Sequence, residues 1–422
     1  MYLSDRHIKN WDENLDDLCF RSKNLYNITN YTIRQHFFVT GKIIGAFDLM
    51  TMFRSDDQID FRSLPIQSSN GIIIAVCDAW KSYFKAKKEY DKYPDKFTGK
   101  PKIPKYKHKT KGRNVVSFTN QQCFLRDGYI VFPKTTNIEP IKTKVDNIHQ
   151  VRIVPNHRCF VIEIIYEKKE EVNLELDSSQ YLAIDCGVNN LATCVSSSGK
   201  TLLLNGRAIK SINQYYNKAL SDMVSKEMIN QKTEKIEWTN RMYRLLHKRN
   251  MKIQDYMHKA SRNIIDYCVE HKIGNIVIGH NKGWKQEVNI GKRNNQNFVQ
   301  IPINKFISMV QYKGRLVGIN VIIVEESYTS KIDHFALEPM KHHANYLGKR
   351  KKRGLFQSST GRLVNADVNG AIGILRKVVG DSGINQIINR GFTDNPLRVK
   401  ISSDWHKSVQ SKSDCHNDKD GL

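Results

Sequence analysis

The sequence predicts an α/β domain in its C-terminal half, preceded by helical segments and a small β-barrel or antiparallel sheet. After residue 181, strand-like runs alternate with long helical segments, which is typical of a sheet covered by helices on both faces. Before that point, apolar residues recur at helical spacing through 14–55 and 71–90. Short β-branched and aromatic runs separated by turn signals fill 114–168, so we expect strands there.

The segment 81–113 differs sharply in composition from the helices before it. It holds 13 Lys or Arg against 3 Asp or Glu, with tyrosines and phenylalanines interleaved. Prolines at 94, 101 and 104 exclude a continuous helix, so we expect a helix end followed by extended chain. This composition favours a surface that follows a phosphate backbone and stacks on bases, and a solvated linker is the alternative. The candidate contacts are Lys100, Lys102, Lys105, Tyr106, Lys107, Lys109 and Lys111.

The net charge indicates the class of partner. The 422 residues include 67 Lys or Arg and 42 Asp or Glu, which gives +25 and a pI near 9.6. A protein this basic most often binds a polyanion, and nucleic acid is the first expectation, ahead of a membrane surface. The N-terminus lacks the apolar core of a signal peptide and no run of eighteen apolar residues occurs, so we expect a cytoplasmic protein. Eight cysteines form no CxxC pair, which argues against a disulfide framework or a zinc ribbon.

The C-terminal half follows a regular order of elements after a boundary near residue 178, where the charged run KKEEVNLELDSS ends. Strands are expected at 181–186, 190–197, 200–205, 275–280 and 320–327. Helices are expected within 207–272, at 302–317 and at 365–378. The tail 380–422 has no convincing apolar period, and we expect it to be disordered.

Acidic residues occur where these elements begin or end. Asp185 ends one strand, Glu325 and Glu326 end the last strand, and Asp367 opens the last helix. Parallel strands bring their C-terminal ends to one edge of a sheet, and Mg²⁺ prefers carboxylate oxygens. Taken singly, each residue has an ordinary explanation as a turn-starting Asp, a solvated charge or a helix N-terminal acid. Together, on a chain of charge +25, they predict a metal site for phosphodiester chemistry.

Several segments resemble TnpB (OrfB) proteins of insertion sequences, which are related to type V CRISPR effectors. The order AIDCGVNNLAT, VEESYTSK and GRLVNADVNGAIGILRK resembles their RuvC-type nuclease domain. NLYNITNYTIRQHFF resembles their recognition lobe, and VVSFTNQQCFLRDGYIVFPK resembles their wedge-type β-barrel. The resemblance covers about residues 15–378, and its most specific motifs are AIDCGVNNLA and NADVNG.

The resemblance implies an α/β RNase H-like (RuvC-type) nuclease domain over 179–379 and a helical recognition domain over 21–95. A wedge-type β-barrel would be formed by 1–20 and 96–178. It also implies a guide RNA from the element itself, recognition of a short flanking motif, and cleavage of double-stranded target DNA with Mg²⁺ or Mn²⁺. Asp185 and Asp367 match the first and third catalytic aspartates of the pattern.

The second catalytic carboxylate departs from the pattern. The strand that should end in a glutamate reads VIGHNKGWKQ, with Gly279 in that position. Glu326 or Glu325 would replace it from the neighbouring strand, about 4.8 Å further from Asp185, and Glu287 is a weaker substitute. Gly279 therefore also motivates a nuclease-inactive, RNA-guided DNA-binding repressor or transposition accessory protein. A transposase that joins DNA strands itself is a third hypothesis.

The segment 331–364 matches the place where the resemblance implies a zinc ribbon. It contains no cysteine, and His334, His342 and His343 alone are weak evidence for structural zinc, so we expect a degenerate region without zinc. The basic run in this segment is more consistent with a nucleic-acid contact, with a solvated loop as the alternative. Its candidate residues are Lys349, Arg350, Lys351, Lys352 and Arg353.

Overall fold

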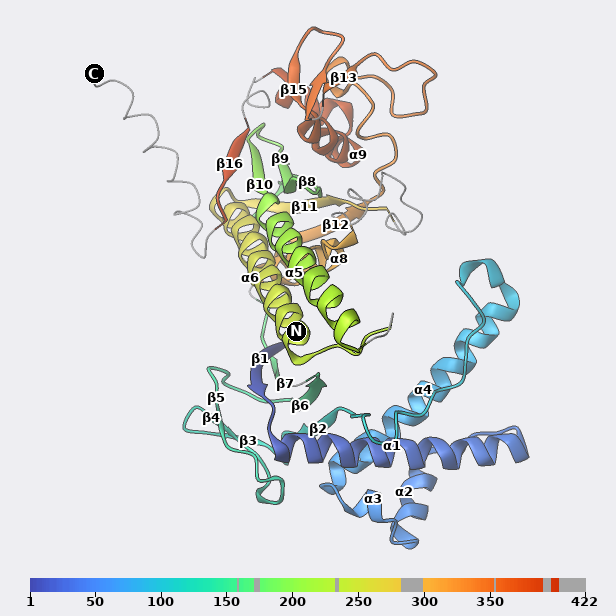
Figure 1. Cartoon of the computed structure of the whole chain (residues 1–422). Helices are drawn as coiled ribbons and strands as arrows, with labels where there is room; N and C mark the ends of the chain where they lie inside the picture. The colour runs from blue at the N-terminus through green and yellow to red at the C-terminus, as the bar shows by residue number, and fades with distance from the viewer. Residues whose placement is uncertain are drawn as a thin grey trace. The chain divides into compact units, whose positions relative to one another are not determined.

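The chain forms two compact units, Met1–Lys169 and Glu170–Leu422, in a computed structural model (Figure 1). The structure describes residues 1–157, 159–170, 175–231, 235–281, 299–352, 354–389 and 396–401. Each unit has its own buried core. No helix in the described ranges is long and apolar enough to cross a membrane.

The longer helices of the first unit overlap the stretches 14–55 and 71–90 where helical apolar spacing predicts them, whereas a short helix and a 3₁₀ turn lie outside these stretches. These elements are α1 (Glu13–Thr40), α2 (Ala46–Ser55), α3 (Ile59–Arg62), α4 (Ile66–Lys92) and the 3₁₀ turn η1 (Pro94–Lys96). Asp12 caps the start of α1 by accepting a hydrogen bond from the Leu15 N–H at 3.0 Å, and α1 ends at Gly41 in a left-handed conformation. Buried Trp80 of α4 donates its indole N–H to Asn30 of α1 at 2.9 Å, which fixes the two long helices together.

The first unit also contains two antiparallel sheets. The larger has the order β1-β7-β6-β2, and the smaller has the order β3-β4-β5. Their bounds are β1 (Tyr2–Asn10), β2 (Val116–Thr119), β3 (Phe124–Arg126), β4 (Tyr129–Val131), β5 (Ile141–Lys142), β6 (Gln150–Asn156) and β7 (Cys159–Glu167), with η2 at Lys134–Thr136. Antiparallel strands in this region are confirmed, whereas the wedge-type barrel and its domain limits stay predictions.

The second unit is built on a six-stranded mixed sheet with the order β12-β11-β8-β9-β10-β16. β8, β11 and β12 run parallel, β9 is antiparallel to both β8 and β10, and β16 runs parallel to β10. The bounds are β8 (Asp177–Asp185), β9 (Asn190–Ser196), β10 (Thr201–Asn205), β11 (Ile273–Gly279), β12 (Asn320–Val324) and β16 (Leu397–Val399).

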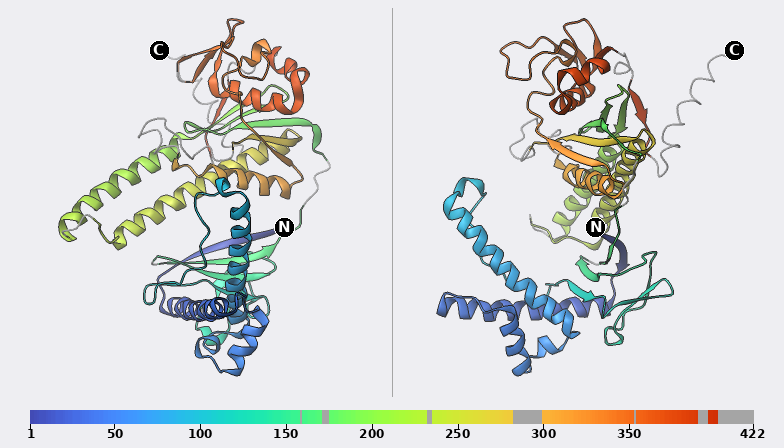
Figure 2. Two further views of the ribbon diagram at one scale, coloured as in Figure 1. Left: turned by 90° about the vertical axis from the view of Figure 1, so that its right-hand side faces the viewer. Right: turned by 180° about the vertical axis from the view of Figure 1, so that it is seen from behind.

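Helices cover both faces of this sheet, as the alternation of strands and helices predicts (Figure 2). One face packs against α5 (Arg207–Gln231), α6 (Asn240–Glu270) and α8 (Ile303–Leu316), and the other against α9 (Ala366–Asn389). Successive residues of each strand are buried on opposite faces of the sheet. In β11, Ile276 and Ile278 belong to the core beneath α5, α6 and α8, and Val277 belongs to the core beneath α9.

A three-stranded antiparallel sheet lies in the second half of the segment between β12 and α9. Its strands are β13 (Lys349–Lys352), β14 (Leu355–Gln357) and β15 (Leu363–Asn365), and the 3₁₀ turn η3 (His334–Ala336) precedes them. Phe356 and Val364 are buried against α9, so this segment shares the second core.

The expected disorder of 380–422 is corrected for two stretches. α9 continues to Asn389 past a break at Gly380, because Ile384 and Ile387 are buried in the core beneath it. Leu397–Val399 forms β16, whose Val399 is also buried. Residues 390–395 and 402–422 lie outside the described residues, as do Glu287 and Arg353.

Candidate metal centre and nucleic-acid interface

Three carboxylates lie at one edge of the six-stranded sheet. Asp185 is the last residue of β8, Glu326 follows β12 by two residues, and Asp367 is the second residue of α9. The strand ends are aligned, because Ile278 lies opposite Ile184 on one side and Gly279 opposite Val324 on the other. Burial, followed by the charges of Glu326 and Asp367, raises the pKa of Asp185 well above its ordinary value. The structure thus brings the three predicted acids together.

The side chain of Glu326 lies over Gly279. A Cβ atom on Gly279 would lie 2.7 Å from Cγ and 2.8 Å from Oε1 of Glu326, and 2.5 Å from Cδ1 of Ile374. Real Cβ atoms essentially never approach other atoms this closely. The absence of a side chain at Gly279 of β11 therefore leaves the space that the side chain of Glu326, from the loop after β12, occupies.

Glu325 and Glu326 differ in environment. Glu325 is exposed, and its Oε1 accepts a hydrogen bond from the Ser327 hydroxyl at 2.7 Å. Glu326 is partly buried, and its backbone N–H donates to Asn281 Oδ1 at 2.8 Å. Burial raises the pKa of Glu326, while the Lys377 ammonium lowers it. Of the two candidates that the sequence left open, the structure places Glu326 beside Asp185.

Asp367 lies in the first turn of α9, and Asp185 lies against the same helix. Asp367 Oδ2 accepts a hydrogen bond from Asn190 Nδ2 at 2.8 Å, and the Asp367 N–H donates to Asn365 Oδ1 at 2.9 Å. The helix approaches β8 closely at Gly370, where a Cβ would lie 2.7 Å from Asp185 Oδ2. A glycine at this position lets the carboxylate lie directly against the helix.

The chemistry of this cluster fits a hard divalent cation. Among the described residues, no group of three His, Cys, Asp or Glu side chains already forms a metal-binding set. Mg²⁺ does not need such a set, because it commonly takes one or two carboxylates and completes its shell with water and phosphate. The charges of Glu326 and Asp367 raise the pKa of Asp185, and a bound cation would remove this repulsion. Asp185, Glu326 and Asp367 are the residues that could hold Mg²⁺ or Mn²⁺.

Two cations lie beside the acids, and only one of them belongs to a basic run that the sequence marks. Arg350 of β13 lowers the pKa of Asp185, so the run at 349–352 lies near the cluster. Lys377 donates to the Glu325 backbone oxygen at 2.6 Å. Asn190, Asn281 and Lys377 were missed, since only the polar turn after Asp185 hinted at the first and no pattern marks the others.

The contribution of Asp185 to the stability of the metal-free protein is expected to fall as the pH rises. Above the usual carboxyl pKa of 3.8, the folded state holds a proton on Asp185 that the unfolded state has released, so stability is present at low pH and lost as pH passes the raised value. Without metal, Asp185→Asn should therefore melt a few degrees above wild type at pH 7.5, and at pH 4 the gap should shrink. Calorimetry at both pH values checks this, and parallel pH profiles would contradict it.

The backbone of the basic segment 100–111 is hydrogen-bonded to side chains of α1. Asn30 and Arg34 donate to the Pro104 carbonyl at 3.1 and 2.6 Å, and Asn27 both donates to and accepts from the backbone of Lys107 at 2.9 Å. These positions of α1 share one helix face. The segment is therefore extended, as its prolines predict, and its backbone faces the helix.

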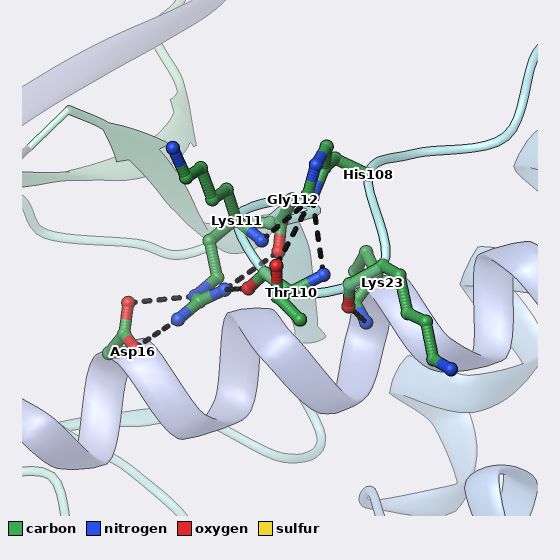
Figure 3. Close-up of polar contacts among 8 residues, drawn as sticks. Asp16, Lys23, His108, Thr110, Lys111 and Gly112 are labelled. Carbon is green, nitrogen blue, oxygen red and sulfur yellow. Dashed lines mark hydrogen bonds and ion pairs between the residues drawn. The ribbon is translucent and has the colours of Figure 1, made fainter. Parts of the chain in front are cut away.

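A tight turn from His108 to Gly112 follows this contact (Figure 3). His108 Nδ1 accepts from the N–H groups of Thr110 and Lys111 at 3.2 and 3.0 Å. Arg113 forms a bidentate pair with Asp16 of α1 at 2.8 and 2.6 Å. Gly112 is required, because a Cβ there would lie 2.5 Å from the His108 carbonyl oxygen. The turn closes the segment onto the start of α1.

Most of the predicted contact residues of this segment project outward. Those with exposed side chains are Lys100, Lys102, Lys105, Tyr106, Lys109 and Lys111. The Tyr106 ring is 44% exposed, and the Arg34 guanidinium lies 4.4 Å from its centroid. Lys107 differs, because its ammonium lies 4.8 Å from the Tyr26 ring and burial lowers its pKa.

Comparisons with known proteins agree with this architecture. A family model described as a probable transposase (OrfB_IS605) matches residues 163–285, and the model of the Cas12f1-like TNB domain matches 304–374. The TnpB-like protein ORF457 of Acidianus two-tailed virus is 26% identical over 204 residues, 47% of this chain and 42% of its own length. The chain is a relative of TnpB proteins and type V effectors.

Two further comparisons define the extent of this relationship. The CRISPR-associated endodeoxyribonuclease Cas12f2 of a Micrarchaeota archaeon (strain CG1_02_47_40) is 22% identical over 251 residues, 54% of this chain and 44% of its own. The chain thus matches less than half the length of both relatives. Cas12f1, in a cryo-EM structure of a Cas12f1–sgRNA–target DNA complex, superposes with a TM-score of 0.52 at 13% identity, covering 86% of this chain and 81% of that one. This likeness shows a shared fold, in line with the predicted RuvC-type α/β domain.

Proposed function

We propose that this chain is an RNA-guided, metal-dependent DNA endonuclease of the insertion-sequence type, which cleaves target DNA beside a short flanking motif. The observation that carries the proposal is the side chain of Glu326, which fills the space over Gly279 and joins Asp185 and Asp367. Simple loss of the second carboxylate would not by itself place another glutamate over Gly279, beside Asp185. The relatives add support, since one is named an endodeoxyribonuclease and another was solved with guide RNA and target DNA.

The proposed centre divides the work among a few residues. Asp185, Glu326 and Asp367 would hold Mg²⁺ or Mn²⁺, which supplies an activated water and charge stabilisation at the phosphate. Asn190 orients the Asp367 carboxylate through its hydrogen bond of 2.8 Å. The exposed Arg350 lies close enough to act on Asp185 and would contact a substrate phosphate.

The remaining parts of the proposal concern nucleic acid. The guide RNA would come from the element that encodes the protein, and the first unit would contain the predicted recognition domain and wedge-type barrel. The exposed lysines of the 100–111 segment, which leave out Lys107, and the basic run at 349–353 would bind phosphates, in line with the net charge of +25. The fixed backbone of the 100–111 segment supports this role, because its exposed cations are held in place before nucleic acid binds.

Cleavage assays test the proposal against its alternatives. Protein co-expressed with RNA from its own flanking locus should cut matched DNA only when both the RNA and Mg²⁺ are present. RNA-dependent DNA binding without any cutting would instead identify a repressor or transposition accessory protein. Strand joining that needs no RNA would identify a transposase.

Affinity for RNA is expected to fall steeply and log-linearly with salt. Each phosphate contact contributes about 0.7 to the slope for single-stranded RNA, so Lys105→Ala and Lys109→Ala should each reduce it by about that amount. Lys107→Ala is the matched control and should change the slope little, because its ammonium already lies over the Tyr26 ring. Binding isotherms at several salt concentrations measure this, and a flat salt response in wild type would refute the polyanion interpretation.

A further inference from the structure

A buried polar cluster lies directly after the loop that carries Glu326. Asp333, His334, Glu338 and Arg376 are each at most 4% exposed. Their charges are satisfied internally: Asp333 accepts from Ser358 Oγ at 2.9 Å, and Arg376 donates to the Glu338 carbonyl at 2.7 Å. Buried polar groups with this many partners fix one arrangement of the chain around them.

His334 occupies the centre of this cluster as a neutral imidazole. Its Nε2 lies 2.8 Å from the Thr329 carbonyl oxygen, which can only accept, so Nε2 carries the hydrogen. Its Nδ1 then faces the Arg376 guanidinium at 3.4 Å. Burial, the largest cause, lowers the pKa of His334 to about 4, which keeps the ring neutral at physiological pH.

The Thr329 residue that His334 bonds is itself bonded to Glu326. Both the N–H and the hydroxyl of Thr329 donate to the Glu326 carbonyl oxygen, at 3.2 and 2.9 Å. A chain of hydrogen bonds thus runs from His334 through Thr329 to the residue that supplies the displaced carboxylate. The position of Glu326 depends on where that loop is held.

The other side of the imidazole packs into α9. A Cβ on Gly373 would overlap His334 Nε2 and would lie 2.8 Å from its Cε1 and 3.0 Å from Thr329 Cβ. The helix therefore has a glycine where the ring and the loop approach it. α9 is also the helix that begins with Asp367 and lies against Asp185 at Gly370. His334 fills the space between the element that carries Asp367 and the loop that carries Glu326.

We propose that His334 is a positioning residue that holds the Glu326 loop against α9 and so sets the spacing of the metal-binding carboxylates. This inference rests on the proposed nuclease function and deepens it. His334 itself touches neither metal nor substrate. This role is needed because Glu326 lies in a loop after the edge strand β12. A carboxylate at the end of β11 would be held by the sheet itself, whereas the Glu326 loop needs a further contact to fix its position.

His334→Leu and His334→Gln separate positioning from plain stability. Leucine fills the space but cannot donate to Thr329, whereas the glutamine amide can replace the Nε2 donor. In the purified protein–RNA complex, His334→Leu should lower the Mn²⁺ affinity measured by calorimetry about tenfold. Loss of a residue that holds a metal ligand in place commonly has an effect of this size. His334→Leu should also raise the Mg²⁺ concentration for half-maximal cleavage by a similar factor. His334→Gln should stay within about threefold of wild type, and RNA affinity should not change.

The result that overturns the inference is a His334→Leu complex that melts earlier but keeps wild-type Mn²⁺ affinity and Mg²⁺ dependence. If His334→Leu does not fold, Thr329→Val tests the last link of the same chain of hydrogen bonds, since it removes the hydroxyl bond to Glu326 and should weaken Mn²⁺ binding about tenfold. Wild-type Mn²⁺ affinity in Thr329→Val would equally overturn it. A wild-type complex that binds no Mn²⁺ and does not cleave refutes the proposed function itself, which distinguishes the two failures.

Discussion

Replacing Glu326 with alanine is expected to lower single-turnover DNA cleavage by about 10³-fold, or about 4 kcal/mol of transition-state stabilisation. The side chain lies over Gly279 and its charge acts on Asp185, so its loss would leave two aspartates where the proposal has three carboxylates holding the metal. The matched control is Glu325→Ala, which removes an adjacent carboxylate of the same type. Glu325 is exposed and bonds Ser327, so this variant should retain cleavage within about threefold.

The measurement compares both variants with the same guide RNA, the same target and saturating Mg²⁺. RNA and DNA affinities should be those of wild type, because neither glutamate belongs to the proposed nucleic-acid contacts. The opposite pattern, with Glu325→Ala inactive and Glu326→Ala active, would assign the displaced ligand to the other glutamate. Equal loss in both would indicate that the loop, and not one carboxylate, matters.

Adding a single methyl group at Gly279 should lower cleavage by about 100-fold. The Cβ of Gly279→Ala would lie 2.7 Å from Glu326 Cγ, so a side chain must shift, and we expect the shift to take the Glu326 carboxylate away from Asp185. The methyl would also press on Ile374 Cδ1 at 2.5 Å, and overpacking of this kind costs about 1–3 kcal/mol of stability. Single-turnover rates and thermal melts should be measured together, so that the loss of rate can be compared with the loss of stability.

Two further variants separate these effects. Ile374→Val removes the clashing Cδ1 and costs about 0.5–1.5 kcal/mol by itself. In the double variant Gly279→Ala/Ile374→Val, stability should partly recover while cleavage stays low, since the glutamate is still displaced. Full recovery of cleavage would mean that overpacking, and not displacement of Glu326, caused the defect. Gly71→Ala in α4 is the control for the cleavage rate, because nothing lies within 4 Å of its added Cβ, and alanine within a helix should only raise stability slightly.

Sequence patterns were sufficient for those parts of the centre that depend on local position. Asp185 ends a buried strand and Asp367 opens a helix, and both are visible from apolar runs and their ends. The choice between Glu325 and Glu326 was not visible, because adjacent residues after a strand have the same pattern. It depends on the turn after β12, where Asn281 from another strand end fixes the backbone of Glu326.

Other features could not be predicted because they depend on contacts between distant segments. The bonds from α1 to the backbone around Lys107 join residues about 80 positions apart, and they use asparagines that resemble ordinary helix surface residues. β16 is three residues long and is stabilised by pairing with β10, so no local period marks it. His334 is similar, because its role depends on Gly373 in a helix that begins 32 residues later.

Metal binding tests the central claim most directly. Mn²⁺ should be titrated calorimetrically into the purified protein–RNA complex of wild type, Asp185→Asn and Asp367→Asn at pH 7.5. We expect wild type to bind Mn²⁺ and each variant, which keeps the shape but removes the charge, to bind at least about tenfold more weakly. Identical Mn²⁺ binding by wild type and both variants would contradict the claim that these carboxylates form a metal centre.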